Sequence, residues 1–169
     1  MIDNMLGIPY IINRHEASLF EVLDVNSHKL SPSLEDYLEA IYSIIEEKQA
    51  VKAIEISRRL GVGRSSVTEA LKNLADKKLV NYRRYDVITL TPSGEKAAKK
   101  VVLKHRVLYD FFTQILDISP EQAEKDACKI EHVISEEVLN KLIAFIEFNK
   151  HFHCKNYDFI NEFKNFAEK

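Results

Sequence analysis

Glycine, proline, cysteine and tryptophan are scarce in this sequence of 169 residues, which contains four, four, two and none of them, respectively. A chain of many short strands needs glycine and proline at its turns, so their scarcity argues against a β-sandwich and favours a mainly α-helical fold. The two cysteines, Cys128 and Cys154, are too few for a disulfide framework. We therefore expect free thiols and a cytoplasmic protein.

Long hydrophobic runs are also missing. No stretch approaches the roughly 18–20 apolar residues that span a membrane, so we expect no membrane partner. The apolar stretch Ile8–Ile12 near the N-terminus has no basic region before it and no small-residue cleavage site after it. A secretory signal peptide is therefore not expected.

Charge is distributed unevenly along the chain. The segment from Lys48 to Lys104 contains fourteen Lys or Arg and five Asp or Glu, a net charge of +9, whereas the whole chain carries −2. The remaining residues therefore carry −11. A basic segment of this size can neutralise DNA phosphates and release their counterions, which is the main source of non-specific affinity for nucleic acids. Charge alone also leaves open a solvated charged surface.

Helical periodicity becomes clear after the sequence Ser31-Pro32-Ser33. Apolar residues recur at helical spacing in the next segment, at Leu34, Tyr37, Leu38, Ile41, Ile44 and Ile45. Ser33 and Asp36 have the spacing of a capping box, so we expect Ser33 to cap this helix.

Two shorter helices and a hairpin are predicted next. One helix is expected over residues 52–60 and ends at Gly61, and the other begins near Arg64. After residue 78 the apolar period changes to two, with Arg84-Tyr85-Asp86 between the two halves, which predicts a short β-hairpin. Two helices joined by a glycine turn and followed by a β-hairpin form a winged helix-turn-helix, a DNA-binding module.

The helix that begins near Arg64 is predicted to read DNA, because the second helix of such a module places its N-terminal turn in the major groove. Its arginine can form a bidentate contact with guanine, and its hydroxyl groups suit phosphates or base edges. The predicted DNA contacts are Arg64, Ser65, Ser66, Thr68, Glu69 and Lys72 on the helix, and Arg83 and Arg84 at the hairpin tip.

Helical signals continue to the C-terminus. A long helix is predicted from Thr91 to about Leu116, further helices begin at Ser119 and Ser135, and the tail is amphipathic. We therefore predict a mainly α protein with four parts. These are an N-terminal extension of unknown structure at 1–30, the winged helix-turn-helix domain at 31–97, a second helical domain at 98–150 and a C-terminal helix at 151–169.

The strongest local chemical signal is the segment Cys128-Lys129-Ile130-Glu131-His132. Its cysteine, glutamate and histidine are spaced i, i+3 and i+4, so they share one face of a helix. A thiolate, a carboxylate and an imidazole on one face can hold a first-row transition metal. Taken alone, the pattern is explained at least as well by a buried cysteine beside a surface Glu–His pair.

Two further features offer metal-binding groups. Asp36 and Glu39 share one face at the start of the first predicted helix, where carboxylates also stabilise the helix dipole without any metal. His105 lies in the middle of the long helix after the hairpin, and a lone histidine is usually a surface residue. These motifs by themselves leave open whether the residues meet.

Taken together, the segments resemble the DtxR/MntR family of metal-dependent transcriptional repressors. The resemblance covers residues 31–148 and rests on the stretches 33–42, 62–74, 104–106 and 126–135. It implies a repressor, of metal-uptake genes in that family, whose second helical domain binds metal and dimerises. The ligands that it implies are Asp36, Glu39, His105, Cys128, Glu131 and His132.

The match combines two branches of that family. Asp36 and Glu39 are similar to the manganese-responsive branch, whereas Cys128 is similar to the iron-responsive branch. Carboxylates favour Mn²⁺ and a thiolate favours softer ions, so we expect Mn²⁺ or Fe²⁺ as cofactor, with Co²⁺, Ni²⁺ or Zn²⁺ binding in vitro. Glu124 and Tyr109 replace the histidine and glutamate of the iron branch's ancillary site. The resemblance also implies a short form without an SH3-like third domain.

The mechanism expected from this resemblance depends on charge. Without metal, the clustered carboxylates and the Cys128 thiolate repel one another at the junction of two domains. Divalent cations would neutralise the cluster and hold the two reading helices of a homodimer at a fixed separation. We therefore expect a double-stranded DNA operator with palindromic half-sites about one DNA turn (~34 Å) apart. Metal and DNA then stabilise the same conformation, so each tightens the other.

Two other groups of residues receive weaker predictions. Dimer contacts are predicted at apolar positions that would equally suit an internal core, namely Val133, Ile134, Val138, Leu142, Ile143, Phe145 and Ile146. His151, His153 and Cys154 are candidates for an additional metal site, although such short polar clusters are usually incidental.

Two other functions are weighed against this one. A metal-independent winged-helix regulator that responds to an organic ligand or a protein partner is the main alternative, but it gives the predicted ligands no common purpose. A zinc hydrolase is more distant, because the sequence has no His-Glu-x-x-His helix, no Ser/His/Asp set and no glycine-rich phosphate loop. We therefore expect no enzymatic activity.

Overall fold

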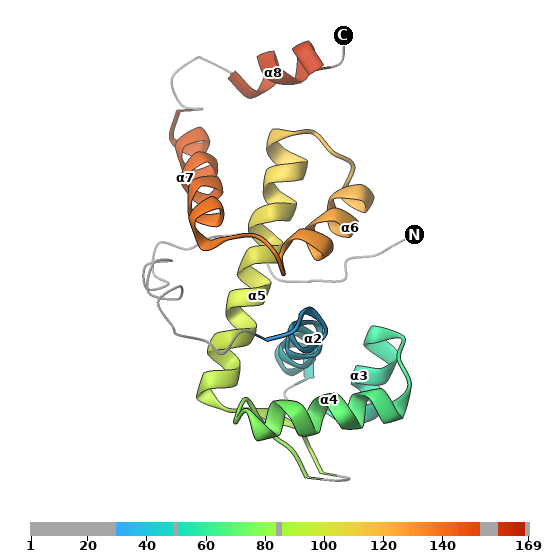
Figure 1. Ribbon diagram of the computed structural model, residues 1–169. Coiled ribbons are helices and arrows are strands. Elements are labelled where there is room, and N and C mark those ends of the chain that lie inside the picture. The colour runs from blue at the N-terminus through green and yellow to red at the C-terminus, as the bar shows by residue number, and fades with distance from the viewer. Residues whose placement is uncertain (1–29, 49–50, 84–85, 153–158, 168–169) are drawn as a thin grey trace.

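The computed structural model describes residues 30–48, 51–83, 86–152 and 159–167, without the side chains of 150–152 and 159–160. Figure 1 shows two lobes that share one long helix, α5. The elements are α2 (Pro32–Lys48), α3 (Ala53–Leu60), α4 (Arg64–Asp76), β1 (Val80–Asn81), β2 (Thr89–Leu90), α5 (Pro92–Asp110), η1 (Phe111–Ile115), α6 (Pro120–Ile130), α7 (Glu136–Phe152) and α8 (Phe159–Ala167). The predicted mainly α fold, with a winged helix-turn-helix beside a helical domain, is confirmed.

Helix α2 begins one residue after Ser31. The Ser31 carbonyl accepts hydrogen bonds from the backbone N–H groups of Leu34 (2.9 Å) and Glu35 (3.1 Å), and its hydroxyl lies 3.4 Å from the Leu34 nitrogen. Pro32 suits the first helical position because that position needs no N–H donor. The prediction that Ser33 caps the helix is wrong, since Ser33 already lies in the first turn.

The glycine turn between α3 and α4 has the predicted form. Gly61 has a φ of 65°, a left-handed conformation that glycine adopts without a steric penalty, and its N–H donates to the Ser57 carbonyl. The Ser57 hydroxyl donates to the Val62 carbonyl at 2.6 Å, which ties the turn to the end of α3. Helix α4 then begins at Arg64, as predicted.

The hairpin follows α4 and leads directly into α5. Strand β1 pairs antiparallel with β2, with Val80 opposite Leu90 and Asn81 opposite Thr89. The first turn of α5 lies so close to the hairpin that a Cβ on Gly94 would stand 1.8 Å from the Leu79 carbonyl oxygen. Only glycine therefore fits at this position.

We call the winged helix-turn-helix the DNA lobe. It encloses a large apolar core. Residues from α2, α3, α4, the hairpin and the first half of α5 are buried there. They are Tyr37, Leu38, Ile41, Ile44, Val51, Ile56, Val67, Ala70, Leu71, Leu74, Val80, Ile88 and Ala98.

The upper lobe, which we call the metal lobe, contains the second half of α5 with η1, α6 and α7. Its smaller core is built on Val107, Leu139 and Ile146. The sequence predicts one regular helix to about Leu116, but the structure changes to a π-helix after Asp110, and the Leu116 N–H donates to the Phe111 carbonyl five residues earlier.

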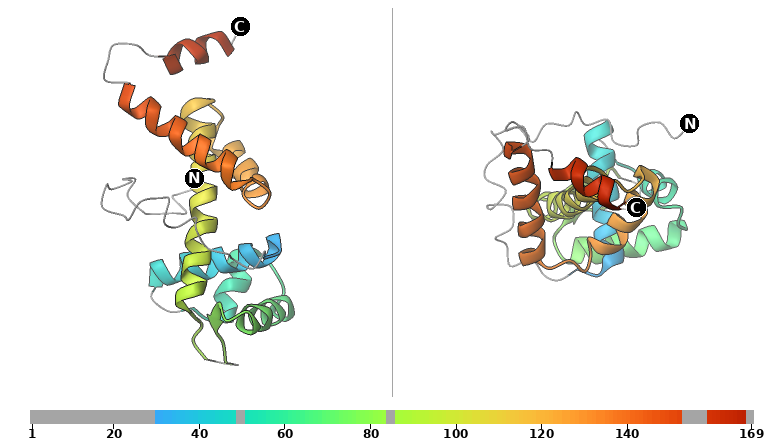
Figure 2. Two further views of the ribbon diagram at one scale, coloured as in Figure 1. Left: turned by 60° about the vertical axis from the view of Figure 1, so that its left-hand side comes forward. Right: turned by 90° about the horizontal axis from the view of Figure 1, so that it is seen from above.

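Helix α5 serves both lobes. Figure 2 shows α2 lying across α5, and the two helices are in contact. Helix α5 runs through the domain boundary predicted between 97 and 98, and α7 continues past the one predicted between 150 and 151. The predicted N-terminal extension lies outside the described residues, apart from Leu30. Among the described helices, none combines the length and the apolar character that a membrane span requires.

Candidate metal centre

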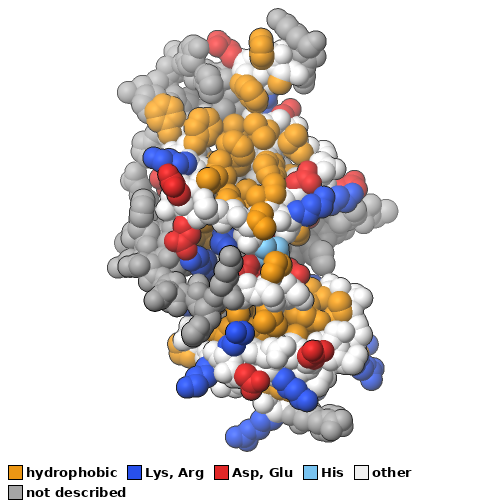
Figure 3. Space-filling view, in the orientation of Figure 1, with side chains coloured by type: hydrophobic (Ala, Val, Ile, Leu, Met, Phe, Trp, Pro, Cys, Tyr) orange, Lys and Arg blue, Asp and Glu red, His pale blue; other side chains and the backbone are white. Residues whose placement is uncertain are grey.

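The six residues predicted as ligands lie together at the junction of the two lobes. Helix α2 contributes Asp36 and Glu39, α5 contributes His105, and α6 and the turn after it contribute the other three. Together with Glu124, their donor atoms form three overlapping groups, and within each group all atoms lie within 4.8 Å of one another. Figure 3 shows a histidine with acidic side chains nearby, in the narrow zone between the apolar areas of the two lobes.

The first group joins the lobes directly and contains Asp36, Glu131 and His132. The His132 Nε2 lies 2.9 Å from Asp36 Oδ1 and 3.4 Å from Glu131 Oε1. Because Asp36 belongs to the DNA lobe and the other two to the metal lobe, any cation held by this group would be shared between the lobes.

The second group lies deeper and contains Glu39, His105 and Glu131. The His105 Nδ1 lies 2.6 Å from Glu131 Oε2. Only 1% of Glu131 and 6% of His105 is exposed. A buried carboxylate requires a charged partner, and Glu131 belongs to both the first and the second group, so it stands at the centre of the cluster.

The third group faces outward and contains His105, Glu124 and Cys128. Glu124 Oε2 lies 3.2 Å from His105 Nε2, and Cys128 Sγ lies 3.8 Å from His105 Nδ1. Cys128 is exposed and Glu131 is buried. This is the reverse of the alternative in which a buried cysteine lies beside a surface Glu–His pair.

The end of α6 determines how Cys128, Glu131 and His132 are presented. The helix ends at Ile130, but Glu131 keeps helical backbone angles and its N–H donates to the Ala127 carbonyl at 3.0 Å. Cys128 and Glu131 therefore keep the predicted helical relation. His132 lies in the following turn, so the prediction of one continuous helix face is wrong for this residue.

The electrostatic environment favours positive charge at the centre. Burial, followed by the charge of Glu131, raises the pKa of Glu39 to about 7. Burial alone would lower the pKa of His105, but hydrogen bonds with Cys128 and Glu131 and the nearby carboxylate charges raise it to about 11. The cluster therefore retains protons when no other cation is present.

The donor set fits a divalent transition metal. It combines carboxylate oxygens, imidazole nitrogens and one thiol, the groups that hold first-row divalent ions in proteins. The burial of Glu131 supports a cation site independently of the donor types. Its carboxylate lies close to those of Asp36 and Glu39, and like charges this close need a shared cation or protons.

One residue of the centre was missed from the sequence. Glu35 Oε2 lies 2.8 Å from the Nδ1 of His132, on the opposite side of the ring from Asp36. Glu35 precedes Asp36 in α2 and is 97 residues from His132, so no local spacing pattern links the two. Glu124 was considered only as a departure from an ancillary site, whereas the structure places it against His105.

The described residues among the predicted DNA contacts lie on α4 and the hairpin, at the lower end of the molecule (Figure 1). Thr68 is partly buried, and its hydroxyl donates to the Arg64 carbonyl at 2.9 Å. Arg84 lies outside the described residues, as do His153, Cys154 and the side chain of His151. The others are exposed, namely Arg64, Ser65, Ser66, Glu69, Lys72 and Arg83.

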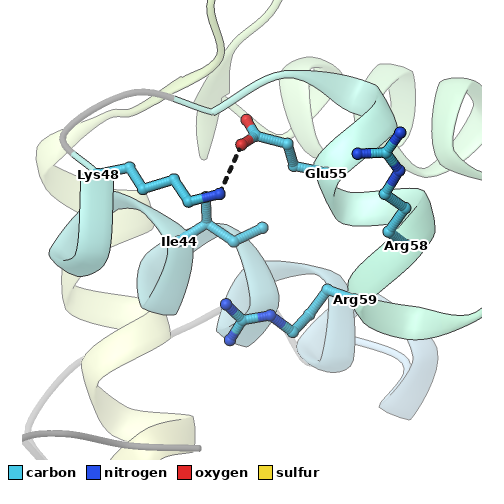
Figure 4. A pocket seen from close by; sticks show the side chains of 5 residues that line it. All are labelled: Ile44, Lys48, Glu55, Arg58 and Arg59. Atoms are coloured by element: carbon cyan, nitrogen blue, oxygen red, sulfur yellow. Dashed lines mark hydrogen bonds and ion pairs between the residues drawn. The ribbon is translucent and has the colours of Figure 1, made fainter.

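A hollow of about 330 Å³ lies elsewhere, between the end of α2 and α3 (Figure 4). Lys48 pairs with Glu55 at 3.0 Å, and Arg59 pairs with Glu47 at 2.7 Å. Pockets for organic ligands are mostly apolar and enclosed, whereas this hollow is open and lined mainly by charged side chains. It therefore gives no support to the organic-ligand alternative.

The residues predicted to form dimer contacts divide into two sets. Val133 is 77% exposed and Val138 is 50% exposed, so both are available to a partner. Ile146 is buried in the core of the metal lobe, and the ring of Phe145 packs edge-on against Phe111. Figure 3 shows a broad apolar area on the face of the metal lobe that is turned toward the viewer.

Comparison with known proteins identifies the family. The "Iron dependent repressor, N-terminal DNA binding domain" matches residues 29–88. The "Iron dependent repressor, metal binding and dimerisation domain" matches residues 91–158. The chain belongs to the iron-dependent repressor family. It is therefore a DNA-binding, metal-dependent transcriptional regulator that dimerises, and the metal-independent alternative is not favoured.

Relatives of this repressor cover most of its length. It is 40% identical over 119 residues to an HTH-type transcriptional regulator of Methanocaldococcus jannaschii, covering 70% of this chain and 95% of that one. It is 36% identical over 118 residues to the "HTH-type transcriptional regulator MntR" of Shouchella clausii, covering 70% of this chain and 82% of that one.

Solved structures of the family share the fold of this repressor. A "manganese-dependent transcriptional repressor complex with manganese" has a TM-score of 0.63 at 29% identity, covering 68% of this chain and 53% of that one. IdeR of T. acidophilum has a TM-score of 0.62 at 27% identity, covering 73% and 57%. The repressor therefore spans little more than half the length of these solved proteins.

Proposed function

We propose that this repressor binds Mn²⁺ or Fe²⁺ at the junction of its lobes and binds operator DNA as a homodimer in the metal-loaded state. The observation that carries the proposal is the 2.9 Å contact between Asp36 Oδ1 of the DNA lobe and His132 Nε2 of the metal lobe. A cation held by both groups would fix the position of α2 relative to the end of α6.

The proposed ligands are the six residues Asp36, Glu39, His105, Cys128, Glu131 and His132. Two carboxylates, of Asp36 and Glu39, and two histidines, His105 and His132, surround the buried Glu131. The carboxylates favour Mn²⁺, whereas Cys128 on the exposed side favours Fe²⁺ and softer ions. The manganese named for the related manganese-dependent transcriptional repressor supports the choice of manganese as the first ion to test.

The charges of the cluster explain why the arrangement of the two lobes would depend on metal. In the metal-free protein, protons on His105 and Glu39 compensate part of the negative charge of the cluster, and a bound divalent ion would take over this compensation. Without it, the carboxylates of α2 repel Glu131, and Glu39 holds a proton because burial and the charge of Glu131 raise its pKa to about 7. The lobes then have a weaker preference for the arrangement in which α2 meets the end of α6, so the position of α4 is less constrained.

The DNA contacts are proposed to come from the exposed residues of α4 and the hairpin. In a symmetric homodimer, a rigid junction sets the distance between the two copies of α4. Palindromic half-sites about one helical turn apart would match this symmetry. Genes for metal uptake are the proposed targets, because repressing them when metal is abundant would limit further uptake of the metal.

The test is DNA binding measured with and without metal. Operator DNA is first selected from random duplexes with the Mn²⁺-loaded protein, and its dissociation constant is then measured anaerobically with Mn²⁺, Fe²⁺ or chelator. Metal is expected to tighten binding by about 5–150-fold. Asp36→Ala should abolish this gain, whereas Glu46→Ala, which removes an exposed acid from the same helix, should retain it. Equal affinity with metal and chelator would contradict the proposal.

A further inference from the structure

Both ring nitrogens of His132 are engaged, and by different neighbours. The Nδ1 lies 2.8 Å from Glu35 Oε2, while the Nε2 lies 2.9 Å from Asp36 Oδ1 and 3.4 Å from Glu131 Oε1. The side chains of His132 and Glu35 are only 9% and 17% exposed, respectively, so water competes little for their contact. The Nε2 faces the first group of candidate ligands, and the Nδ1 faces away from it.

Glu35 does not belong to any of the three groups of potential ligands in the described part of the chain. Its carboxylate instead reaches the one ring nitrogen of His132 that the groups leave unused. In metal sites a carboxylate in this place accepts the free N–H of a ligating histidine, fixes its tautomer and ring orientation, and increases its basicity.

We propose that Glu35 is a positioning residue for the metal centre. Its carboxylate accepts the Nδ1–H of His132 and thereby holds the Nε2 lone pair toward Asp36 and Glu131. Because Glu35 and Asp36 are neighbours on α2, the DNA lobe contacts both ring nitrogens of His132, Nδ1 through Glu35 and Nε2 through Asp36. The inference deepens the proposed function, on which it rests.

Two substitutions separate positioning from direct ligation. In Glu35→Gln the amide oxygen still accepts the Nδ1–H, so positioning should largely survive although the negative charge is lost. In Glu35→Ala the acceptor is removed and the ring is free to rotate or change tautomer. If Glu35 were instead a direct metal ligand, both substitutions would remove its negatively charged carboxylate. Both variants would then bind the metal weakly.

The experiment is Mn²⁺ titration calorimetry on the full chain without DNA. Glu35→Ala should bind Mn²⁺ about 10–100-fold more weakly than the unsubstituted protein, while Glu35→Gln should stay within a few-fold of it. Glu46→Ala is the matched control on α2 and should bind normally. Thermal melting of the metal-free variants, followed by circular dichroism, checks that each is folded.

A spectroscopic measurement reports on the histidine itself. In the Zn²⁺-loaded, ¹⁵N-histidine-labelled protein, the His132 resonances should show a protonated Nδ1 and a metal-bound Nε2. This signature should persist in Glu35→Gln and disappear in Glu35→Ala, a difference that a merely structural role of Glu35 would not produce.

The outcomes distinguish the inference from the proposed function. Equal Mn²⁺ affinity of Glu35→Ala and the unsubstituted protein overturns the positioning role, and so does a Glu35→Gln variant as weak as Glu35→Ala. If the unsubstituted protein itself binds no Mn²⁺, Fe²⁺ or Zn²⁺, the proposed function fails first and the inference falls with it.

Discussion

The two lobes differ in what they bury. In the DNA lobe, the most deeply buried side chains are apolar, such as Leu38, Ile41 and Leu71, and its core draws on all three helices of the winged helix-turn-helix. In the metal lobe the buried apolar core is small, and Glu131 is 1% exposed beside the 6% exposed His105. One lobe is therefore held by its hydrophobic core, and the other depends more on polar and charged contacts.

This difference assigns separate roles to the two lobes. Apolar burial is insensitive to metal and keeps the winged helix-turn-helix folded whether or not a cation is bound. Clustered carboxylates depend on cations or protons for compensation, so we expect the metal lobe and its junction with α2 to respond to metal and pH. Metal is therefore expected to change how the lobes are held together and to leave the fold of the reading helix unchanged.

The largest expected effect comes from breaking the packing of the DNA lobe. In Gly94→Ala, the new Cβ would lie 1.8 Å from the Leu79 carbonyl oxygen, so the hairpin and α5 must move apart. We expect a loss of at least about 3 kcal/mol in the free energy of unfolding, since both clashing groups are backbone or fixed to it. Urea denaturation measures this loss.

Gly63→Ala is the control for that substitution. Its Cβ would meet only the Ser65 hydroxyl, at an ordinary 3.7 Å, so the cost should be limited to the weaker capping by alanine, at most about 1 kcal/mol. Similar losses for the two variants would show that the close approach at Gly94 does not limit stability.

The next effect concerns the junction and leaves the DNA lobe intact. Glu131→Gln keeps the volume of the side chain but removes the charge at the centre of the cluster. The gain in DNA affinity on adding Mn²⁺, about 5–150-fold in the unsubstituted protein, should fall to nearly one. Fluorescence anisotropy with the selected operator measures this gain. The exposed Glu137→Gln on α7 should retain it, and a full Mn²⁺ response in Glu131→Gln would refute the central role of this carboxylate.

Arg64→Ala tests the DNA lobe, where a substitution should weaken DNA binding without affecting metal binding. Arg64 is exposed at the start of α4, and losing its contacts should cost about 1–3 kcal/mol in DNA binding. Mn²⁺ affinity measured without DNA should not change, because the residue is remote from the centre. Lys141→Ala removes a similar charge from the metal lobe and should bind DNA normally. Equal losses in the two variants would indicate a non-specific effect of charge.

The smallest effect is a pH dependence of the metal-free protein. The pKa of Glu39 is raised from 4.5 to about 7 by burial and by Glu131, so the folded chain binds this proton more tightly than the unfolded chain. Stability due to Glu39 is therefore complete below pH 4.5 and is lost as the pH rises through 7, by roughly 1–3 kcal/mol. Urea denaturation with chelator at pH 5 and pH 7 measures it.

Glu39→Gln supplies the control for this pH dependence, because the amide does not titrate. The difference in stability between pH 5 and pH 7 should be smaller in this variant than in the unsubstituted protein. An unchanged difference would assign the pH dependence to other residues of the chain.

Much of the DNA lobe could be predicted from sequence because its signals are local. The apolar period, the glycine turn and the change of period after residue 78 each depend on neighbouring residues, and both ends of α3 and the start of α4 were predicted to within one residue. The ends of helices were less predictable, since Ser31 and Ser33 are equally plausible caps until the path of the chain is known.

The sequence predicted six residues that the structure brings together at the candidate metal centre, but not how they are arranged. Resemblance to a family supplied the six candidate ligands, while the burial of Glu131 and the exposure of Cys128 depend on how α6 packs against α5. The contact between Glu35 and His132 joins residues 97 positions apart and follows from tertiary packing alone. The π-helical turn after Asp110 likewise has no signal in the apolar period.

The most direct test is anomalous diffraction at the manganese edge from crystals grown with Mn²⁺. We expect an anomalous peak within bonding distance of at least one carboxylate of α2, from Asp36 or Glu39, and at the same time of Glu131 or His132. A peak bound by residues of the metal lobe alone, with both α2 carboxylates turned away, would contradict a switch that works by joining the two lobes.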